Sequence, residues 1–302
     1  MATGYLHPGY AESLSEFGTP RELPQSGGWL LERQIPGCPD RDAMGCYPLF
    51  CCQDWSLLRD DVESLGEDLV SVALVTDPFG AYDQGLLQRC FRDVVFPFKT
   101  HYIVDLSRSR NAVVSSHHRY YARKALKLVQ VEACHEPHRF FNDWLSLDNV
   151  LVERHAITGI KAFSDTAFAK QMNLPGFVML RATYGHTTVA AKLAFLQGNV
   201  VYGHVMAMSE LGYKIGAAYA LYWSAIEYFA DKARWYDIGA VPGTASKGQD
   251  GLDQFKRGWS TCTRTAYFCG RILNRARYGD LVAKKAIGSA DYFPAYRFNE
   301  YG

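Results

Sequence analysis

The sequence predicts an α+β protein of two lobes, each a mixed, largely antiparallel sheet flanked by helices. The chain has 302 residues, which is enough for two half-size lobes that each bury a core. Strand-like and helix-like segments alternate in the first half, and three β-rich runs separated by glycine-bearing turns follow later. We therefore predict lobes at residues 1–155 and 156–302.

The first lobe opens with an irregular segment over residues 1–45, which carries one strand around 29–35. Apolar and β-branched runs predict further strands at 47–52, 69–75, 99–107 and 129–134. Helical segments separate the strands, and Asp54 is a plausible N-cap for the first of them. These helices are expected at 54–65, 83–95, 115–129 and 137–155.

The second lobe is strand-dense. Its three β-rich runs cover 176–185, 187–198 and 199–210, a pattern typical of an antiparallel meander. A helix at 216–233 is apolar on nearly all sides, which indicates that it is buried. A strand, a short helix, a last strand and a polar helical tail are expected at 234–241, 251–259, 263–273 and beyond.

Composition excludes several classes of protein. The formal net charge is +1, so the chain as a whole is not a basic partner for nucleic acid or anionic membrane. The first ten residues lack a basic segment and an apolar segment of the secretory type, so we expect a cytoplasmic protein. The eight cysteines contain no CxxC, and no histidine pair has zinc-ligand spacing, so no metal is expected.

The stretch "YDIGAVPGTASKGQDGLDQFKRGWS" carries the first candidate site. Asp237 ends a predicted strand, where it orients a loop N–H, accepts a substrate amine, or simply caps the loop. Lys256 follows the loop, and a lysine beside a reacting carbonyl stabilises an oxyanion; the alternative is a solvated helix face. Tyr236 lies next to the aspartate, and Arg257 lies close to Trp259, which brings a cation and an aromatic side chain together. Tyr236 and Arg257 are therefore candidate substrate contacts.

A second candidate is the junction "SELGYKIGAAYALYW", where a strand ends and a long helix begins. The N-terminus of a helix offers free N–H groups and a partial positive charge, which suit a phosphate or pyrophosphate. Lys214, Gly216 and Ala217 are the residues expected to contact that group. An ordinary glycine-rich turn is the alternative, because neither a Walker motif nor a GxGxxG is present.

The segment "SSHHRYYARKALKLV" predicts a helix with a basic face. Arg119, Arg123 and Lys127 recur every four residues, away from the apolar side. This face either binds an anionic part of a substrate or is only solvated. His204, within "VVYGHVMAM", is either a core histidine or a catalytic base.

In order, "GNVVYGHVMAMSE", "YALYWSAIEYFADKARWYDIGA" and "GLDQFKRGW" resemble the carboxy-terminal lobe of the FemABX-like branch of the GNAT superfamily. That family shows an "LxWxxIxxA" helix, a strand ending "DxGG" and a "GLxxFKxxW/F" segment. "HHRYYARKALK" is similar to its "RxxxRKA" helix, and the resemblance covers residues 100–275. The matching residues are Leu221, Trp223, Ile226, Ala230, Asp237, Gly239, Gly251, Leu252, Phe255 and Lys256.

The chain departs from the family pattern in two places. Ala240 stands where the second glycine of "DxGG" is expected, so the loop is less permissive. A Q/RxxGxG/A pyrophosphate loop, typical of the members that use acetyl-CoA, is missing, and "GYKIGA" only approximates it. The second departure leaves the identity of the acyl donor open.

The resemblance implies two tandem GNAT-like lobes and an N-acyltransferase that acts on an amine of a small metabolite, sugar or cell-envelope precursor. The resemblance implies acyl-CoA as the co-substrate, and acetyl-CoA is the first candidate among acyl-CoAs. It also implies that Lys256 faces the centre at which the acyl group is transferred. Aminoacyl-tRNA is the alternative donor. A non-catalytic GNAT-fold binding protein is the alternative from another class. The base is left open between Asp237, His204 and a water molecule.

Overall fold

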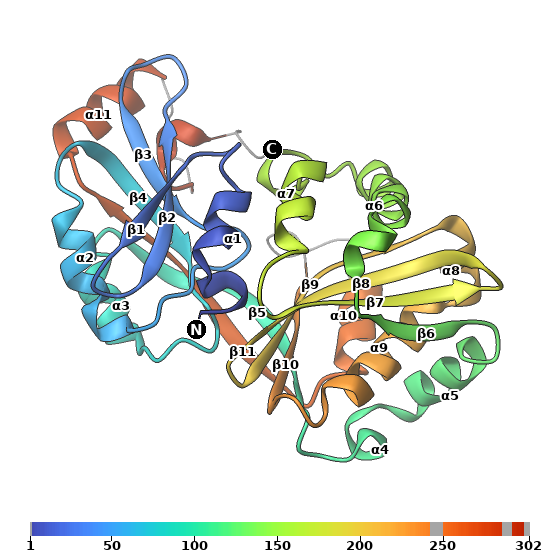
Figure 1. Cartoon of the computed structure of the whole chain (residues 1–302). Coiled ribbons are helices and arrows are strands. Elements are labelled where there is room, and N and C mark those ends of the chain that lie inside the picture. The colour runs from blue at the N-terminus through green and yellow to red at the C-terminus, as the bar shows by residue number, and fades with distance from the viewer. Residues whose placement is uncertain (1, 242–249, 286–291, 299–302) are drawn as a thin grey trace. The chain divides into compact units, whose positions relative to one another are not determined.

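The computed structural model describes residues 2–241, 250–285 and 292–298 (Figure 1). The chain divides into two compact units, each of which is α+β. The first comprises Met1–Gly4, Lys99–Ile157 and Ser164–Arg264, and the second comprises Tyr5–Phe98, Thr158–Phe163 and Thr265–Gly302. No helix within the described ranges is both long enough and apolar enough to cross a bilayer.

The first unit holds both predicted site stretches. Its sheet runs in the order β5-β10-β9-β8-β7-β6. The strands are β5 (Val94–Asp105), β6 (Gln130–Cys134), β7 (Phe177–Tyr184), β8 (Thr187–Gln197), β9 (Val200–Met208) and β10 (Trp235–Ala240). The helices are α4 (Arg110–Val113), α5 (Ser116–Ala125), α6 (Phe141–His155), α7 (Asp165–Gln171), α8 (Glu210–Ile215), α9 (Ala217–Phe229) and α10 (Asp250–Arg257). Figure 1 shows α6 and α7 on one face of this sheet and α5 and α9 on the other.

The second unit has a sheet in the order β1-β2-β3-β4-β11. Its strands are β1 (Thr19–Leu23), β2 (Gly28–Gln34), β3 (Arg41–Gly45), β4 (Leu69–Val75) and most of β11 (Cys262–Ile272). Its helices are α1 (Pro8–Ser13), α2 (Leu58–Ser64), α3 (Gln84–Cys90) and α11 (Arg275–Lys284).

The two sheets share one topology. Each contains a three-stranded antiparallel meander, β1-β2-β3 or β7-β8-β9, and in the first unit β6 also pairs antiparallel with β7. The third strand of each meander then pairs in parallel with the next strand, β4 or β10, after a connecting helix. An antiparallel strand completes each sheet: β11 beside β4, and β5 beside β10. The chain therefore contains a structural repeat, and the prediction of an α+β fold with a mixed, largely antiparallel sheet flanked by helices is confirmed.

The strands that complete the sheets explain why the compact units are interleaved along the chain. β5 comes from the first half of the sequence but pairs with β10, and β11 comes from the end of the chain but pairs with β4. A division at residue 155 follows chain order and does not coincide with the boundaries of the compact units. The assignment of lobes to 1–155 and 156–302 stays a prediction.

Several local elements differ from the sequence-based expectation. The segment 1–45, expected to be irregular with one strand, contains α1, β1, β2 and β3, and residues 94–95, expected in a helix, begin β5. The segment 47–52 forms a single bridge, from Phe50 to Thr76, because Pro48 cannot donate to a ladder. The basic helix ends at Ala125, so Lys127 lies beyond its last turn. The junction before α9 is itself helical, since α8 occupies residues 210–215.

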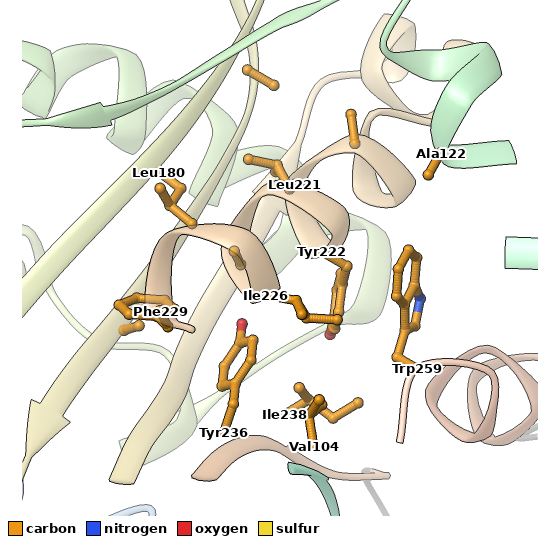
Figure 2. Close-up of a cluster of buried hydrophobic side chains, with 14 of the residues drawn as sticks. Val104, Ala122, Leu180, Leu221, Tyr222, Ile226, Phe229, Tyr236, Ile238 and Trp259 are labelled. Atoms are coloured by element: carbon orange, nitrogen blue, oxygen red, sulfur yellow. The ribbon is translucent and has the colours of Figure 1, made fainter. Parts of the chain in front are cut away.

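The core of the first unit is built around α9. Its buried residues pack against the sheet on one side and α5 on the other (Figure 2). Tyr222 stacks on Trp259 with ring centroids 5.4 Å apart, which connects α9 to the residues that follow α10. Phe229 contacts Tyr236 at 5.6 Å, so the β10 tyrosine lies inside this core.

The Tyr236 hydroxyl supplies the first prediction. Its oxygen is fully buried and has no hydrogen-bond partner among the described residues. Tyr236→Phe removes a desolvated polar group, so we expect the free energy of unfolding to stay equal or rise, by up to about 1 kcal/mol. Tyr296→Phe is the matched control, because its hydroxyl bonds Ser71 and Asp42 and its loss should destabilise. Urea unfolding of both variants checks this, and a marked loss of stability in Tyr236→Phe would contradict it.

Candidate functional site

Asp237 fixes the end of β10. Its carboxylate is 2% exposed and both of its oxygens are engaged. Oδ1 accepts a hydrogen bond from the Gly239 backbone N at 2.7 Å, and Oδ2 lies 2.7 Å from His101 Nδ1 on β5. Gly239 has a φ of +81°, which a glycine adopts without strain. Asp237 therefore ties the turn after β10 to the neighbouring strand.

Lys256, on α10, reaches this turn from the other side. Its Nζ donates to Ile238 O at 3.0 Å and to Ala240 O at 2.7 Å. The residue is 8% exposed, so it does not lie on a solvated helix face. Burial lowers the pKa of the Lys256 amine to about 8, and the Asp237 carboxylate opposes this shift. The amine is therefore mostly protonated at pH 7.

Helix α10 is held in place by α5. His118 is buried, its Nε2 donates to Phe255 O at 3.0 Å, and its Nδ1 accepts from Ser115 Oγ at 2.8 Å. A Cβ at Gly258 would lie 2.1 Å from the His118 ring, so only glycine allows this approach. His118 is thus a packing residue that positions the Lys256 helix, rather than a surface cation of the basic face.

Lys192 was not identified from the sequence. It lies within the apolar strand β8 and is 4% exposed, with Nζ 4.3 Å from the centroid of the Tyr222 ring. Burial, and then the charge of Lys256, lower the pKa of the Lys192 amine to about 7, while Asp237 opposes the shift. Within the described chain its Nζ makes no hydrogen bond or ion pair. The available signal was a single lysine in the run "VAAKLAF".

These groups meet where β9 and β10 separate. The parallel pairing of the two strands runs to Asp237 and Tyr202, whereas β9 continues along β8 to Met208. A Cβ at Gly203 would lie 3.2 Å from Asp237 O and 3.4 Å from Lys192 Nζ. A Cβ at Gly239 would lie 3.3 Å from Lys256 Nζ. We call Lys192, Gly203, Asp237, Gly239 and Lys256 the fork site.

His204 is half-buried and Tyr236 is fully buried. His204 Nε2 is 3.0 Å from Gln171 Oε1 on α7, and burial lowers the pKa of its imidazole to about 3. Such a group is a weak base at neutral pH, so the core-histidine alternative is the better description. Tyr236 is fully buried against Phe229, which disfavours a direct substrate contact.

The junction predicted for pyrophosphate binding is only partly as expected. Gly212 lies inside α8, and a Cβ there would be 2.2 Å from Val189 O, so its backbone packs on β8. Gly216 adopts φ +69° between the two helices, and α9 begins at Ala217 without a side-chain cap. Lys214 is exposed in the last turn of α8. A phosphate contact of Lys214, Gly216 and Ala217 stays a prediction.

The predicted substrate-binding cations divide into two kinds. Arg119 donates to Asn111 O and Val114 O, both at 2.6 Å, so it holds α4 against α5. Arg257 is exposed and pairs with Asp253 at 2.5 Å beside a hollow of about 450 Å³. Arg123 and Lys127 are exposed and form no ion pair within the described residues, and the neighbouring Lys124 is exposed as well. Arg123 and Lys127 are therefore two free cations of this surface.

The arrangement is suited to acyl transfer at a carbonyl carbon. Lys256 is a buried, pre-positioned cation, and such a group stabilises the negative charge that develops on a carbonyl oxygen. No group of three or more His, Cys, Asp and Glu residues in the described ranges is placed to hold a metal ion.

Comparison with solved structures shows the same fold. FemX covers 92% of its own length and 90% of this chain, with 15% identity and a TM-score of 0.67. L-PGS from Bacillus licheniformis matches 93% of this chain and 96% of its own, with 14% identity and a TM-score of 0.55. The C-terminal domain of a candidate lysylphosphatidylglycerol synthetase from Agrobacterium fabrum covers 94% of this chain and 92% of its own, with 10% identity and a TM-score of 0.59. The resemblance to the FemABX-like branch is confirmed at the level of fold, whereas no protein-family model and no curated protein matches the sequence.

Lys192 gives a stability prediction with a defined pH dependence. Its pKa of about 7 in the folded state lies below the value of about 10.4 in the unfolded chain. The unfolded state therefore binds more protons between these values, so the lysine destabilises the fold most below pH 7 and ceases to do so above about pH 10. We expect Lys192→Met to stabilise the protein by on the order of 4 kcal/mol at pH 6, and by less at pH 9.

Urea unfolding at pH 6 and pH 9 measures this difference. Lys284→Met, at an exposed position of α11, is the matched control and should change stability little at either pH. Destabilisation by Lys192→Met, or an equal effect at both pH values, would show that burial does not disfavour the charged amine.

Proposed function

We propose that the protein is an acyltransferase in which an amine attacks an activated carboxyl carbon directly, with Lys256 stabilising the oxyanion. The observation that carries this proposal is the position of Lys256, buried and donating to Ile238 O and Ala240 O at the end of β10. In that role Lys256 Nζ exchanges one of the two backbone carbonyls for the developing oxyanion. The enzyme thus needs no covalent intermediate of its own.

An aminoacyl ester, presented on tRNA, is the donor that the structure favours. The exposed part of α5 and the turn after it combine free cations with aromatic side chains. Arg123 and Lys127 follow Tyr120 and Tyr121 closely in the sequence, and these tyrosines are 62% and 38% exposed. Cations that contact phosphates, together with aromatic rings on which bases stack, are typical of single-stranded nucleic-acid binding. The chain also shares its fold with FemX, with L-PGS and with the C-terminal domain of a lysylphosphatidylglycerol synthetase, a name that denotes a lysyl-bearing product.

Acyl-CoA is the second candidate donor. The observation in its favour is the uncapped start of α9 after Gly216, where backbone N–H groups suit a pyrophosphate. The helical state of residues 210–215 counts against a glycine-rich phosphate loop there. Either donor is made in the cytoplasm, and that is the location that we propose.

A transfer assay tests the proposal. Bulk aminoacyl-tRNA and acetyl-CoA are supplied in parallel, with glucosamine, lysine and a lysine-containing muramyl pentapeptide as amine acceptors. Label that moves from donor to acceptor supports the proposal. Absence of transfer for every pair, with a folded protein, would favour the non-catalytic binding protein instead.

Lys256→Met is expected to lower kcat by about 100- to 1,000-fold, because it removes one oxyanion donor. Circular dichroism and the melting temperature establish whether the variant folds, and Lys284→Met is the control. Since the protonated amine is the active form, kcat/KM of the unaltered protein should fall as pH rises through about 8. Lys256→Arg should move that fall to higher pH; normal turnover in folded Lys256→Met would remove the lysine from the mechanism.

Reversing the two free cations distinguishes the donors. In an Arg123→Glu, Lys127→Glu double variant, we expect the KM for aminoacyl-tRNA to rise and its dependence on salt to weaken by about two phosphate contacts. The KM for acetyl-CoA should not change. Steady-state rates from 50 to 200 mM salt provide the measurement. An unaltered salt slope for tRNA would mean that this surface is only solvated.

A further inference from the structure

Attack by an amine on an ester requires a group that accepts the amine proton. The two side chains considered for this role from the sequence do not suit it. His204 Nε2 is engaged by Gln171 Oε1 at 3.0 Å, and burial lowers the pKa of its imidazole to about 3. Asp237 uses Oδ1 for Gly239 N and Oδ2 for His101.

His101 has the geometry of an oriented base. Because the Asp237 carboxylate only accepts hydrogen bonds, the 2.7 Å contact places the proton on His101 Nδ1 and leaves the lone pair on Nε2. Its side chain is 9% exposed, and no hydrogen bond to Nε2 occurs within the described part of the chain. A buried imidazole held through one nitrogen, with the other unpaired, is the arrangement found in carboxylate-oriented general bases.

Strand register places this imidazole beside the oxyanion donor. His101 on β5 pairs with Ala240 on β10, and Ala240 O accepts the hydrogen bond from Lys256 Nζ at 2.7 Å. The pairing of β5 with β10 therefore positions a proton acceptor, His101, and a cation, Lys256, around the segment that ends at Ala240. Direct acyl transfer needs these two groups on either side of the reacting carbon.

We propose that His101 is the general base of this site and that Asp237 positions it through Nδ1, an inference that rests on the proposed transferase function. As the amine nitrogen bonds to the carbonyl carbon, His101 Nε2 accepts a proton from that nitrogen. The carbon–oxygen bond of the ester, or the carbon–sulfur bond of a thioester, then breaks. The imidazolium returns the proton to the departing oxygen or sulfur, which leaves an amide and a neutral alcohol or thiol.

Three charged or titratable side chains surround this step. Asp237 on β10 accepts the hydrogen bond from His101 Nδ1, and the amines of Lys256 on α10 and Lys192 on β8 interact with the same carboxylate. Lys192 is the competing base. Its Nζ packs over the Tyr222 ring on the other side of the fork site, and Gly203 separates it from Asp237 O.

The experiment compares pH profiles of kcat/KM for His101→Gln, Asp237→Asn and the control His155→Gln, an exposed histidine at the end of α6. The donor and acceptor are the pair that shows transfer in the unaltered protein. We expect His101→Gln to lower kcat at least 100-fold with little change in the donor KM, and to abolish the acidic limb of the profile.

Asp237→Asn keeps the shape of the site but lets the imidazole tautomer vary, so we expect a smaller loss and a shifted acidic limb. It also tests the inference if His101→Gln does not fold. An unchanged rate and profile in either folded variant would overturn the role of His101, as would loss of the acidic limb in Lys192→Met instead. No transfer by the unaltered protein with any donor would overturn the proposed function, and the base assignment with it.

Discussion

The candidate site depends on one buried carboxylate. Asp237 holds the backbone of Gly239, the imidazole of His101 and, through its charge, the two buried amines of Lys192 and Lys256. A carboxylate removed from water is stable only when hydrogen bonds and opposite charge replace its solvation. Those replacements come from three strands and one helix. The aspartate therefore couples the geometry of β10 to the positions of the groups around it.

The electrostatics of the fork site oppose the stability of the protein. Two amines share one carboxylate, and one of them, Lys192, rests on an aromatic face instead of a counterion. A methionine of similar size would satisfy the apolar surroundings without the cost of desolvating a charge. A lysine at a position where methionine would be more stable is typical of functional sites, in which pKa values are shifted at the expense of stability.

The repeated topology explains how distant segments come together. In each sheet a meander, a parallel strand and an antiparallel strand follow one plan, and the last strand comes from the other part of the chain. His101 belongs to the first half of the sequence and Asp237 to the second, yet β5 pairs with β10. The proposed base thus reaches the site only because β5, from the first half of the sequence, pairs with β10.

The sequence by itself determined the α+β class, the strands of the meander, the buried α9 and the helix that carries "FKR", because these follow from periodicity and local motif. It did not reveal Lys192 or His101, since a lone lysine in an apolar strand and a histidine 136 residues from its carboxylate leave no local pattern. Only the tertiary structure decided which histidine meets Asp237, which cations stay free and where each sheet is completed. Strand pairing and burial set those properties, and both depend on contacts between residues far apart in the chain.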